Sequence, residues 1–224
     1  YYTTHIRYLS KMKINSFSKK SFSWKVSATI IFVSLLGIFF SINSIIYADK
    51  EFRNSLLDRT KIISHIFDLN SIESLSASEA DFKNTNYIKI KSELSALSKI
   101  NSETRFVYLA GYNGKDVFFF ADSEPDGSSE SSPPGQIYDE ASPTFIKTFV
   151  SKTNEIDGPT RDRWGVWISS LSPILDPETG NVVAVVGIDI NARNYYITLA
   201  LYGSIPILIS LILSIFVFLI YREN

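Results

Sequence analysis

Two short segments of the chain gather side chains that could bind a small polar molecule. Asp189 lies in an apolar run, on the same alternating face as Val185 and Gly187. A buried carboxylate is costly without a partner, so we expect Asp189 to meet a ligand amine, an internal arginine or a backbone donor. The second segment combines two guanidinium groups, a carboxylate and two indoles: Arg161, Asp162, Arg163, Trp164 and Trp167. Such mixtures of apolar and polar groups are typical of small-molecule pockets.

Each of these candidate binding residues also has a purely structural explanation. Asp189 could cap the end of a strand, and Trp164 and Trp167 could be core residues. Tyr108 and Phe119 are candidate pocket walls on a predicted hairpin, with an ordinary aromatic core as the alternative. Asp122 could contact a ligand or cap the turn-rich loop that follows it. The residues alone leave these alternatives open.

Catalytic chemistry has little support in the composition. The chain has no cysteine, and its two histidines are His5 and His65, so residues 66–224 contain none. Most thiol, zinc and iron–sulfur sites are therefore excluded, and a hydrolase would lack its usual base. We expect no catalytic residue, no metal site and no cofactor in this segment, although it could be the sensory part of an enzyme.

Two long uncharged runs predict two membrane spans. No side chain in residues 26–48 or 194–221 carries a charge near pH 7. Roughly 20 apolar residues of helix cross a hydrocarbon layer of about 30 Å, which predicts transmembrane helices at residues 26–47 and 199–221. Aromatic residues of the type found at membrane interfaces bracket both runs: Trp24, Tyr47, Tyr195, Tyr196, Tyr202 and Tyr221.

The segregation of charge predicts the orientation of these spans. Residues 1–47 carry six basic residues and no acid, whereas residues 48–198 carry 22 acidic and 15 basic residues. Basic flanks stay in the cytoplasm, so we expect residues 1–25 and 222–224 to be cytoplasmic and residues 48–198 to be extracytoplasmic. A cleaved signal peptide is the alternative, but the apolar run is long for one. Met12, the only methionine, is a candidate natural start, and the natural chain is expected to extend past Asn224.

Between the spans, the hydrophobic pattern predicts an α+β domain. Helical periodicity covers residues 49–78, which continue the first span, and residues 87–99 and 142–152. One hairpin is predicted at residues 105–121 with a type I′ turn at Asn113-Gly114, and a second at residues 163–191. Its last strand is apolar on both faces and is expected to be central. The result is an antiparallel sheet packed against helices.

Two further patterns concern the link between the domain and the membrane. The strand at residues 182–190 leads into the second span with no Gly or Pro before Gly203. A movement of the sheet would therefore be transmitted directly to the second span. Small residues four apart, which favour close helix packing, give a weak dimer signal: Gly37, Ser41, Ser210 and Ser214.

Five short blocks follow one another between the two spans. They are RFVYL at 105–109, FADSEP at 120–125, PGQIY at 134–138, GPTRDRWGVW at 158–167 and VGIDI at 186–190. In order and spacing they resemble the extracytoplasmic Cache (PDC, PAS-like) sensor domain of prokaryotic membrane sensors such as histidine kinases and diguanylate cyclases. The resemblance covers about residues 50–195 and both spans.

This resemblance implies a five-stranded, PAS-like antiparallel sheet behind a long N-terminal helix. It also implies a small-molecule pocket between the sheet and the loop-helix segment, with Asp189 at a position that contacts ligand in such domains. The match to the amino-acid-binding subgroup is poor, so no ligand identity is implied.

Together these patterns predict a two-span receptor that signals across the membrane. The outer domain would bind a small amino acid, amine or carboxylate and bias a cytoplasmic output module, with a sensor histidine kinase of a two-component system as the leading expectation. We expect a homodimer in contact with membrane lipid, and no nucleic-acid partner. The alternative is a membrane-anchored interaction module without signalling, which would show an exposed apolar patch in place of an enclosed pocket.

Overall fold

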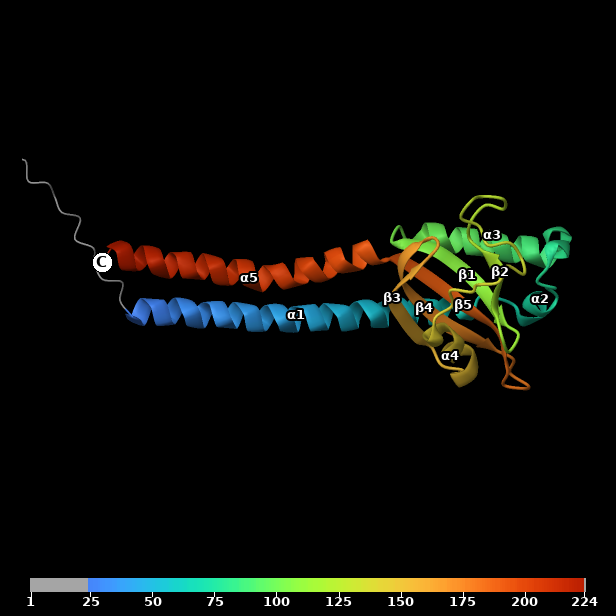
Figure 1. Cartoon of the computed structure of the whole chain (residues 1–224), viewed down its shortest axis with the longest axis horizontal. Coiled ribbons are helices and arrows are strands. Elements are labelled where there is room, and N and C mark those ends of the chain that lie inside the picture. The colour runs from blue at the N-terminus through green and yellow to red at the C-terminus, as the bar shows by residue number, and fades with distance from the viewer. Residues whose placement is uncertain (1–23, 224) are drawn as a thin grey trace, which may run out of the picture.

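Two long helices form a stalk that carries a compact domain at one end (Figure 1). The computed structural model describes residues 24–223, and the predictions for Met12 and most of the basic flank lie outside this range. Helix α1 (Trp24–Ser64) and helix α5 (Ala192–Glu223) lie side by side along the stalk. With 41 residues, α1 is about 60 Å long. It therefore runs from the predicted span into the domain without a break.

Both stalk helices are long and apolar enough to cross a membrane. Their apolar side chains point outward: Phe39 is 59% exposed and Phe216 is 60% exposed. A helix in the core of a water-soluble domain would bury such residues. The two helices therefore have the surface expected of segments surrounded by lipid.

The domain is built on one five-stranded antiparallel sheet with the strand order β2-β1-β5-β4-β3. The strands are β1 (Thr104–Tyr112), β2 (Val117–Asp122), β3 (Glu155–Asp162), β4 (Gly165–Leu175) and β5 (Val182–Asn191). Strand β5 is central, as its two apolar faces predicted, and it pairs with β1 and β4. The predicted fold class, an α+β PAS-like sheet with a long N-terminal helix and two flanking apolar helices, is confirmed.

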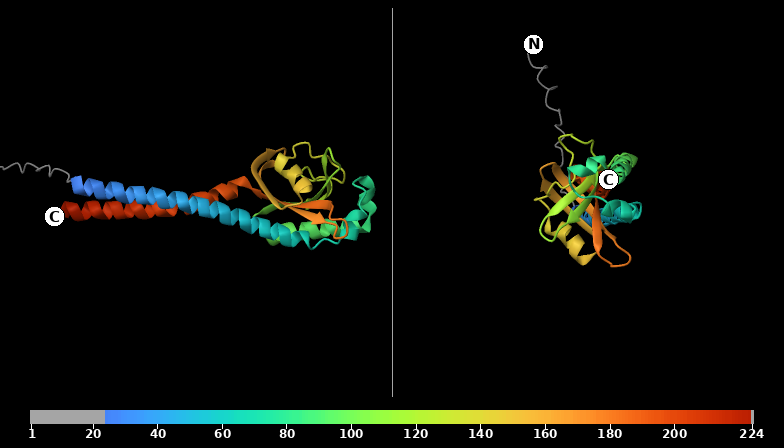
Figure 2. Two further views of the ribbon diagram at one scale, coloured as in Figure 1. Left: turned by 90° about the horizontal axis from the view of Figure 1, so that it is seen from below. Right: turned by 90° about the vertical axis from the view of Figure 1, so that its right-hand side faces the viewer.

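Each face of the sheet has its own hydrophobic core, and helices cover both faces (Figure 2). One face packs against α1 and α3 (Thr85–Ile100), with α2 (Leu69–Glu73) and a 3-10 turn (Glu79–Lys83) closing its far end. Aliphatic residues fill this core, among them Leu56, Leu94 and Ile168. The other face is covered by the loop at residues 123–142 and by α4 (Pro143–Ser151). Its core is mostly aromatic, and it holds the candidate site.

Two elements differ from the sequence prediction. Helix α1 ends at Ser64 rather than near residue 78, because Asp68 accepts a hydrogen bond from the Ser71 amide and begins the separate helix α2. Strand β3 was not predicted, because it contains Gly158 and Pro159, which normally indicate a loop. It lies at the sheet edge, where a missing amide proton is tolerated, and its register shifts at these residues.

The first hairpin is in the predicted place, but its turn is not of type I′. Such a turn needs positive φ at both central residues, and only Gly114 has one, at 91°. The Asn113 side chain instead accepts hydrogen bonds from the amides of Lys115 and Asp116. A four-residue loop therefore joins β1 and β2.

The small residues of the two spans are used within the chain. The Ser41 hydroxyl donates to the Gly203 carbonyl at 2.7 Å. A Cβ added at Gly37 would lie 2.2 Å from the Ser210 hydroxyl. These residues thus let α1 and α5 of one chain approach each other closely, and the homodimer stays a prediction.

Candidate functional site

The candidate site is a pocket on the aromatic face of the sheet, beneath the loop at residues 123–142. Strands, the loop and the β3–β4 turn contribute its lining: Phe106, Tyr108, Phe119, Asp122, Glu130, Ser132, Tyr138, Asp162, Trp164 and Asp189. Five of the eight residues predicted as ligand contacts are among them: Tyr108, Asp122, Asp162, Trp164 and Asp189. No basic side chain lines this pocket.

Asp189 lies on the central strand of the sheet, two residues before that strand ends. It lies on β5 opposite Phe106 of β1 and Ser169 of β4, and it is only 7% exposed. The Tyr108 hydroxyl donates to its carboxylate at 3.3 Å, and the Ser169 hydroxyl donates as well. Burial raises the pKa of Asp189 to about 7, and the negative charge of Asp162 adds to this effect. Its carboxylate is thus buried with hydroxyl donors and no counter-charge.

Asp162, in contrast, is a structural acceptor. One of its oxygens accepts from the amides of Trp164 and Gly165, at 2.9 and 3.0 Å, and from the Trp167 indole at 2.8 Å. The other accepts from the Tyr138 hydroxyl at 3.0 Å. These bonds hold the β3–β4 turn and attach the loop at residues 123–142 to it.

Asp122 is also satisfied inside the protein. The Lys91 ammonium lies 2.6 Å from it, and the amides of Glu124 and Ser132 donate to it. Burial raises the pKa of Asp122, while these partners act in the opposite direction. The contacts favour the loop-capping explanation for this residue.

The remaining carboxylate, Glu130, belongs to an ion-pair cluster. Arg105 pairs with both Glu130 and Glu124. Within residues 24–223, no group of three or more carboxylate or histidine side chains is arranged to hold a metal ion.

Aromatic rings form the walls of the pocket. The Phe119 ring lies 5.5 Å from Tyr108, 5.4 Å from Tyr138 and 6.2 Å from Trp164, measured between ring centroids. Tyr108 reaches this position because Gly187 has no side chain, since a Cβ there would lie 2.1 Å from the tyrosine ring. We refer to Tyr108, Phe119, Tyr138 and Trp164 as the aromatic cage.

The free space inside this pocket is small. It measures about 20 Å³, which is room for one water molecule. The resemblance implied a pocket of ligand size, so the place is as predicted but the size is not. A solute can enter only if the cage and the covering loop move outward.

Three of the predicted ligand contacts lie outside the pocket lining. Trp167 is buried at 5% exposure, with its ring 5.1 Å from that of Phe106, as a core residue would be. Arg163 pairs with Asp139 and Glu140, and its guanidinium lies 5.2 Å from the centroid of the Trp164 ring. Arg161 is exposed on edge strand β3.

The sequence prediction missed several lining residues. Tyr138, Ser132 and Glu130 all lie in the loop at residues 123–142, whose turn-rich composition gave no sign of which side chains point inward. The PGQIY block that ends in Tyr138 was the available signal. Phe106 was missed because its strand carries apolar residues on both faces.

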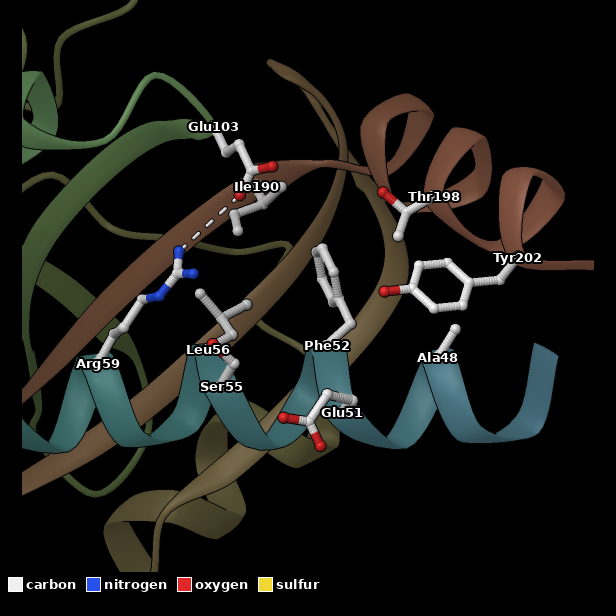
Figure 3. Close-up of a pocket in the computed structure, with 10 residues that line it drawn as sticks. All are labelled: Ala48, Glu51, Phe52, Ser55, Leu56, Arg59, Glu103, Ile190, Thr198 and Tyr202. Carbon is white, nitrogen blue, oxygen red and sulfur yellow. Dashed lines mark ion pairs between the residues drawn. The ribbon is translucent and has the colours of Figure 1, made fainter. Parts of the chain in front are cut away.

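A second cavity of about 200 Å³ lies where the domain meets the stalk (Figure 3). Helix α1 lines one side and helix α5 the other, with Ile190 at the end of β5 between them. Its walls are Ala48, Glu51, Phe52, Ser55, Leu56, Arg59, Glu103, Ile190, Thr198 and Tyr202. Arg59 and Glu103 approach to 3.8 Å across it. The packing between α1 and α5 is therefore incomplete on this side of the junction.

Polar bonds join α1, α5 and β3 at the same level. The Tyr195 hydroxyl donates to Asp49 at 2.6 Å, and Arg53 donates to Asp49 at 2.7 Å. Arg53 also donates to the Gly158 carbonyl of β3 at 3.2 Å. We call Asp49, Arg53 and Tyr195 the junction clasp. Tyr195 was predicted to be an interfacial aromatic, but it is 6% exposed and belongs to the domain base.

Comparisons with solved structures find sensory domains. The ligand-binding domain of the Campylobacter jejuni chemoreceptor Tlp3 in complex with L-valine is similar over 80% of this chain and 68% of that one, with 14% identity and a TM-score of 0.49. The same sensory domain with isoleucine bound is similar over the same shares, with 13% identity and a TM-score of 0.46.

The extracellular domain of the putative histidine kinase mmHK1S-Z2 is also similar, with 11% identity and a TM-score of 0.42, over 75% of this chain and 61% of that one. No protein-family model matches the chain, and no curated protein matches its sequence.

Proposed function

We propose that the chain is the sensory part of a transmembrane receptor that binds a small solute. In this proposal residues 26–47 and 199–221 span the membrane, residues 48–198 lie outside, and both ends of the chain face the cytoplasm. The receptor acts as a homodimer embedded in lipid. It controls an output module beyond this sequence, for which a histidine kinase is the first expectation.

One observation carries the proposal. Asp189 stands on the central strand β5, and β5 ends at Asn191 immediately before α5 begins at Ala192. No linker separates the pocket floor from the second apolar helix. A movement of β5 on solute binding is thus transmitted to α5 within a few residues.

We propose that α5 takes two positions at the junction. On one side the junction clasp holds α5 to α1 and β3, and on the other side the cavity of about 200 Å³ leaves room for movement. A solute can shift such a balance only through its different affinity for the two states. Here the difference arises because the empty pocket is closed and a filled one must be open.

A chimaera tests this proposal. The chain is fused after Asn224 to the catalytic part of a histidine kinase, placed in lipid nanodiscs and screened with small amines, carboxylates and amino acids for changes in autophosphorylation. We expect at least one solute to change the activity. Insertion of Gly-Gly between Asn191 and Ala192 should abolish the response while the solute still binds.

The control is the same Gly-Gly insertion in the exposed β1–β2 loop after Gly114, which should leave the response intact. A solute that binds the pocket without changing kinase activity contradicts the proposal. So does an unchanged response in the Asn191 insertion variant.

A second candidate function has one observation in its favour. A groove of about 280 Å³ lies between α1 and α3, lined largely by apolar side chains. Its isoleucines are exposed, with Ile62 at 67%, Ile66 at 50% and Ile100 at 78%. This surface favours a membrane-anchored interaction module. Ile62→Glu and Ile100→Glu variants that lose a protein partner, in a chain whose chimaera never responds to solutes, would select this alternative.

A further inference from the structure

We infer that the pocket at Asp189 takes a small cationic amine, held by the Asp189 carboxylate within the aromatic cage. This inference rests on the proposed function and names the ligand class, which the sequence left open among amino acids, amines and carboxylates. Its four supports are the charge of the lining, the arrangement of rings, the lack of an anion site and the size of the pocket.

The charge of the lining is entirely negative. Four carboxylates and no basic residue line the pocket. Three of the four have partners inside the protein: Asp122 has Lys91, Glu130 has Arg105, and Asp162 accepts four hydrogen bonds. Asp189 alone is buried without a cation or a backbone donor. A buried charge in this state is stabilised most by a ligand of opposite sign.

The aromatic cage suits the same ligand. Tyr138 and Trp164 lie 6.1 Å apart between ring centroids, and Tyr108 and Phe119 lie 5.5 Å apart. Aromatic faces attract cations through the ring quadrupole, and cages of several rings bind ammonium groups. Tyr108 joins the two features, because its hydroxyl donates to Asp189 while its ring packs edge to face with Phe119.

A ligand carboxylate has no place to bind among these residues. Anion recognition in proteins depends on arginine, lysine or converging amide groups. The two arginines nearest in sequence to the cage, Arg161 and Arg163, do not line the pocket, and Arg163 is already paired with Asp139 and Glu140. Amino acids and carboxylic acids would therefore meet the lining carboxylates without a partner.

The size of the pocket selects small amines. The free space of about 20 Å³ admits one water, so each added methyl group must push the walls outward. The wall that must move in this proposal is the loop that carries Tyr138, Ser132 and Glu130, because the other walls belong to the sheet and its turns. Its backbone bonds to β2 at residues 135–138 must then open as well. In this proposal, the binding of an ammonium ion opens this loop, and the opening changes the position of β5.

The test uses the full chain in lipid nanodiscs and a graded series of probes. Binding of methylammonium, dimethylammonium, trimethylammonium and tetramethylammonium is measured by calorimetry and by thermal unfolding, next to acetate, succinate, glycine and valine. We expect one or more of the ammonium ions to bind and to raise the melting temperature, and the anions and zwitterions not to do so. Asp189→Asn should weaken that binding at least tenfold.

Asp58→Asn is the matched control, because Asp58 is exposed on α1 outside the pocket, and it should bind like the unchanged chain. Binding of acetate, succinate or valine without binding of any ammonium ion overturns the amine inference and leaves the receptor proposal standing. A cooperatively folded chain that binds none of the ammonium ions also overturns it. Failure of the receptor proposal is recognised separately, by a bound solute that leaves the kinase chimaera unchanged.

Discussion

Asp189 is the residue on which the chemistry of the pocket depends. Its carboxylate is 7% exposed and receives only hydroxyl donors. Burial raises its pKa to about 7, so near neutral pH it changes between a neutral acid and an unpaired buried anion. The acids and hydroxyl groups that line the pocket with it or act on its pKa are Tyr108, Ser169, Asp122, Asp157, Asp162, Tyr138 and Glu130. Lys91 pairs with Asp122 and Arg105 with Glu130, so these cations are already neutralised.

The pH dependence of stability follows from this burial. The folded chain holds the Asp189 proton up to pH about 7, whereas an unfolded chain loses it near pH 4. The empty protein should therefore lose stability as the pH rises from 4 to 7, by up to about 4 kcal/mol for this group. Thermal unfolding of the full chain in nanodiscs at graded pH measures this. Asp189→Asn should flatten the change, and equal slopes in the two proteins would contradict the pKa assignment.

The aromatic cage gives a prediction for affinity. Trp164→Leu removes one ring face but keeps an apolar wall, so an ammonium probe that binds the unchanged chain should bind roughly 3- to 30-fold more weakly. Calorimetric titration measures the change. Arg161→Ala, which removes an exposed charge from the neighbouring strand, should leave the affinity unchanged. A loss of affinity in Arg161→Ala alone would place the ligand outside the cage.

The sequence predicted the pocket residues on the strands better than those in the loop at residues 123–142. Asp189 was predicted because a carboxylate in an otherwise apolar strand needs a partner, and Tyr108 because it is an aromatic residue of the predicted first hairpin. Tyr138 lies in an irregular loop, where no periodicity indicates the inward residues. Arg163 was predicted as a ligand contact from its type alone, and its pairing with Asp139 and Glu140 depends on loop geometry that the sequence does not reveal.

At the scale of elements, the junction clasp determines how firmly α5 is held. Tyr195 on α5 donates to Asp49 on α1, and Arg53 links the same pair to the Gly158 carbonyl of β3. The Tyr195 ring also packs on Phe52 at 5.3 Å. Movement of α5 must loosen these bonds.

Removing the Tyr195 hydroxyl from the junction clasp should change the position of α5 in the absence of solute. Tyr195→Phe keeps the ring contact but loses the hydrogen bond to Asp49, at a cost of about 1 kcal/mol. The kinase chimaera should then show altered activity without any solute, measured as basal autophosphorylation. Tyr196→Phe, on the next and 55% exposed residue, should behave like the unchanged chain. Identical basal activity in the unchanged chain, Tyr195→Phe and Tyr196→Phe would show that the junction clasp has no regulatory role.

The elements that the sequence mispredicted have local causes. The end of α1 at Ser64 depends on a cap formed by Asp68, and the preceding residues carry no Gly or Pro to mark it. Edge strand β3 contains Gly158 and Pro159, which normally indicate a loop. The central strand and the helices at residues 85–100 and 143–151 were predicted because long periodic patterns average out such local effects.

For the whole molecule, the contact between α1 and α5 along the stalk links the two helices. Gly37 faces Ser210, and Ser41 bonds to Gly203, so the helices touch through small residues along the predicted spans. Close contact of this kind permits sliding or tilting but not free separation.

A bulky residue at the helix contact should separate the stalk. Gly37→Val places side-chain atoms where Ser210 now lies, since even a Cβ would come within 2.2 Å. We expect wider spacing between α1 and α5 and loss of the solute response in the kinase chimaera. Ala28→Val, at an exposed position of the same helix, is the control and should respond normally. A normal response in Gly37→Val would show that the stalk contact is not required.

The central claim is that filling the pocket at Asp189 moves α5 relative to α1. The chain has no cysteine, so spin labels at Ala28→Cys and Arg222→Cys report the distance between the two helices at the far end of the stalk. In nanodiscs, an ammonium probe that binds with the labels present should shift this distance distribution, and Asp189→Asn or the Gly-Gly insertion after Asn191 should abolish the shift. A distance distribution that stays the same with the pocket saturated by the probe would contradict the account.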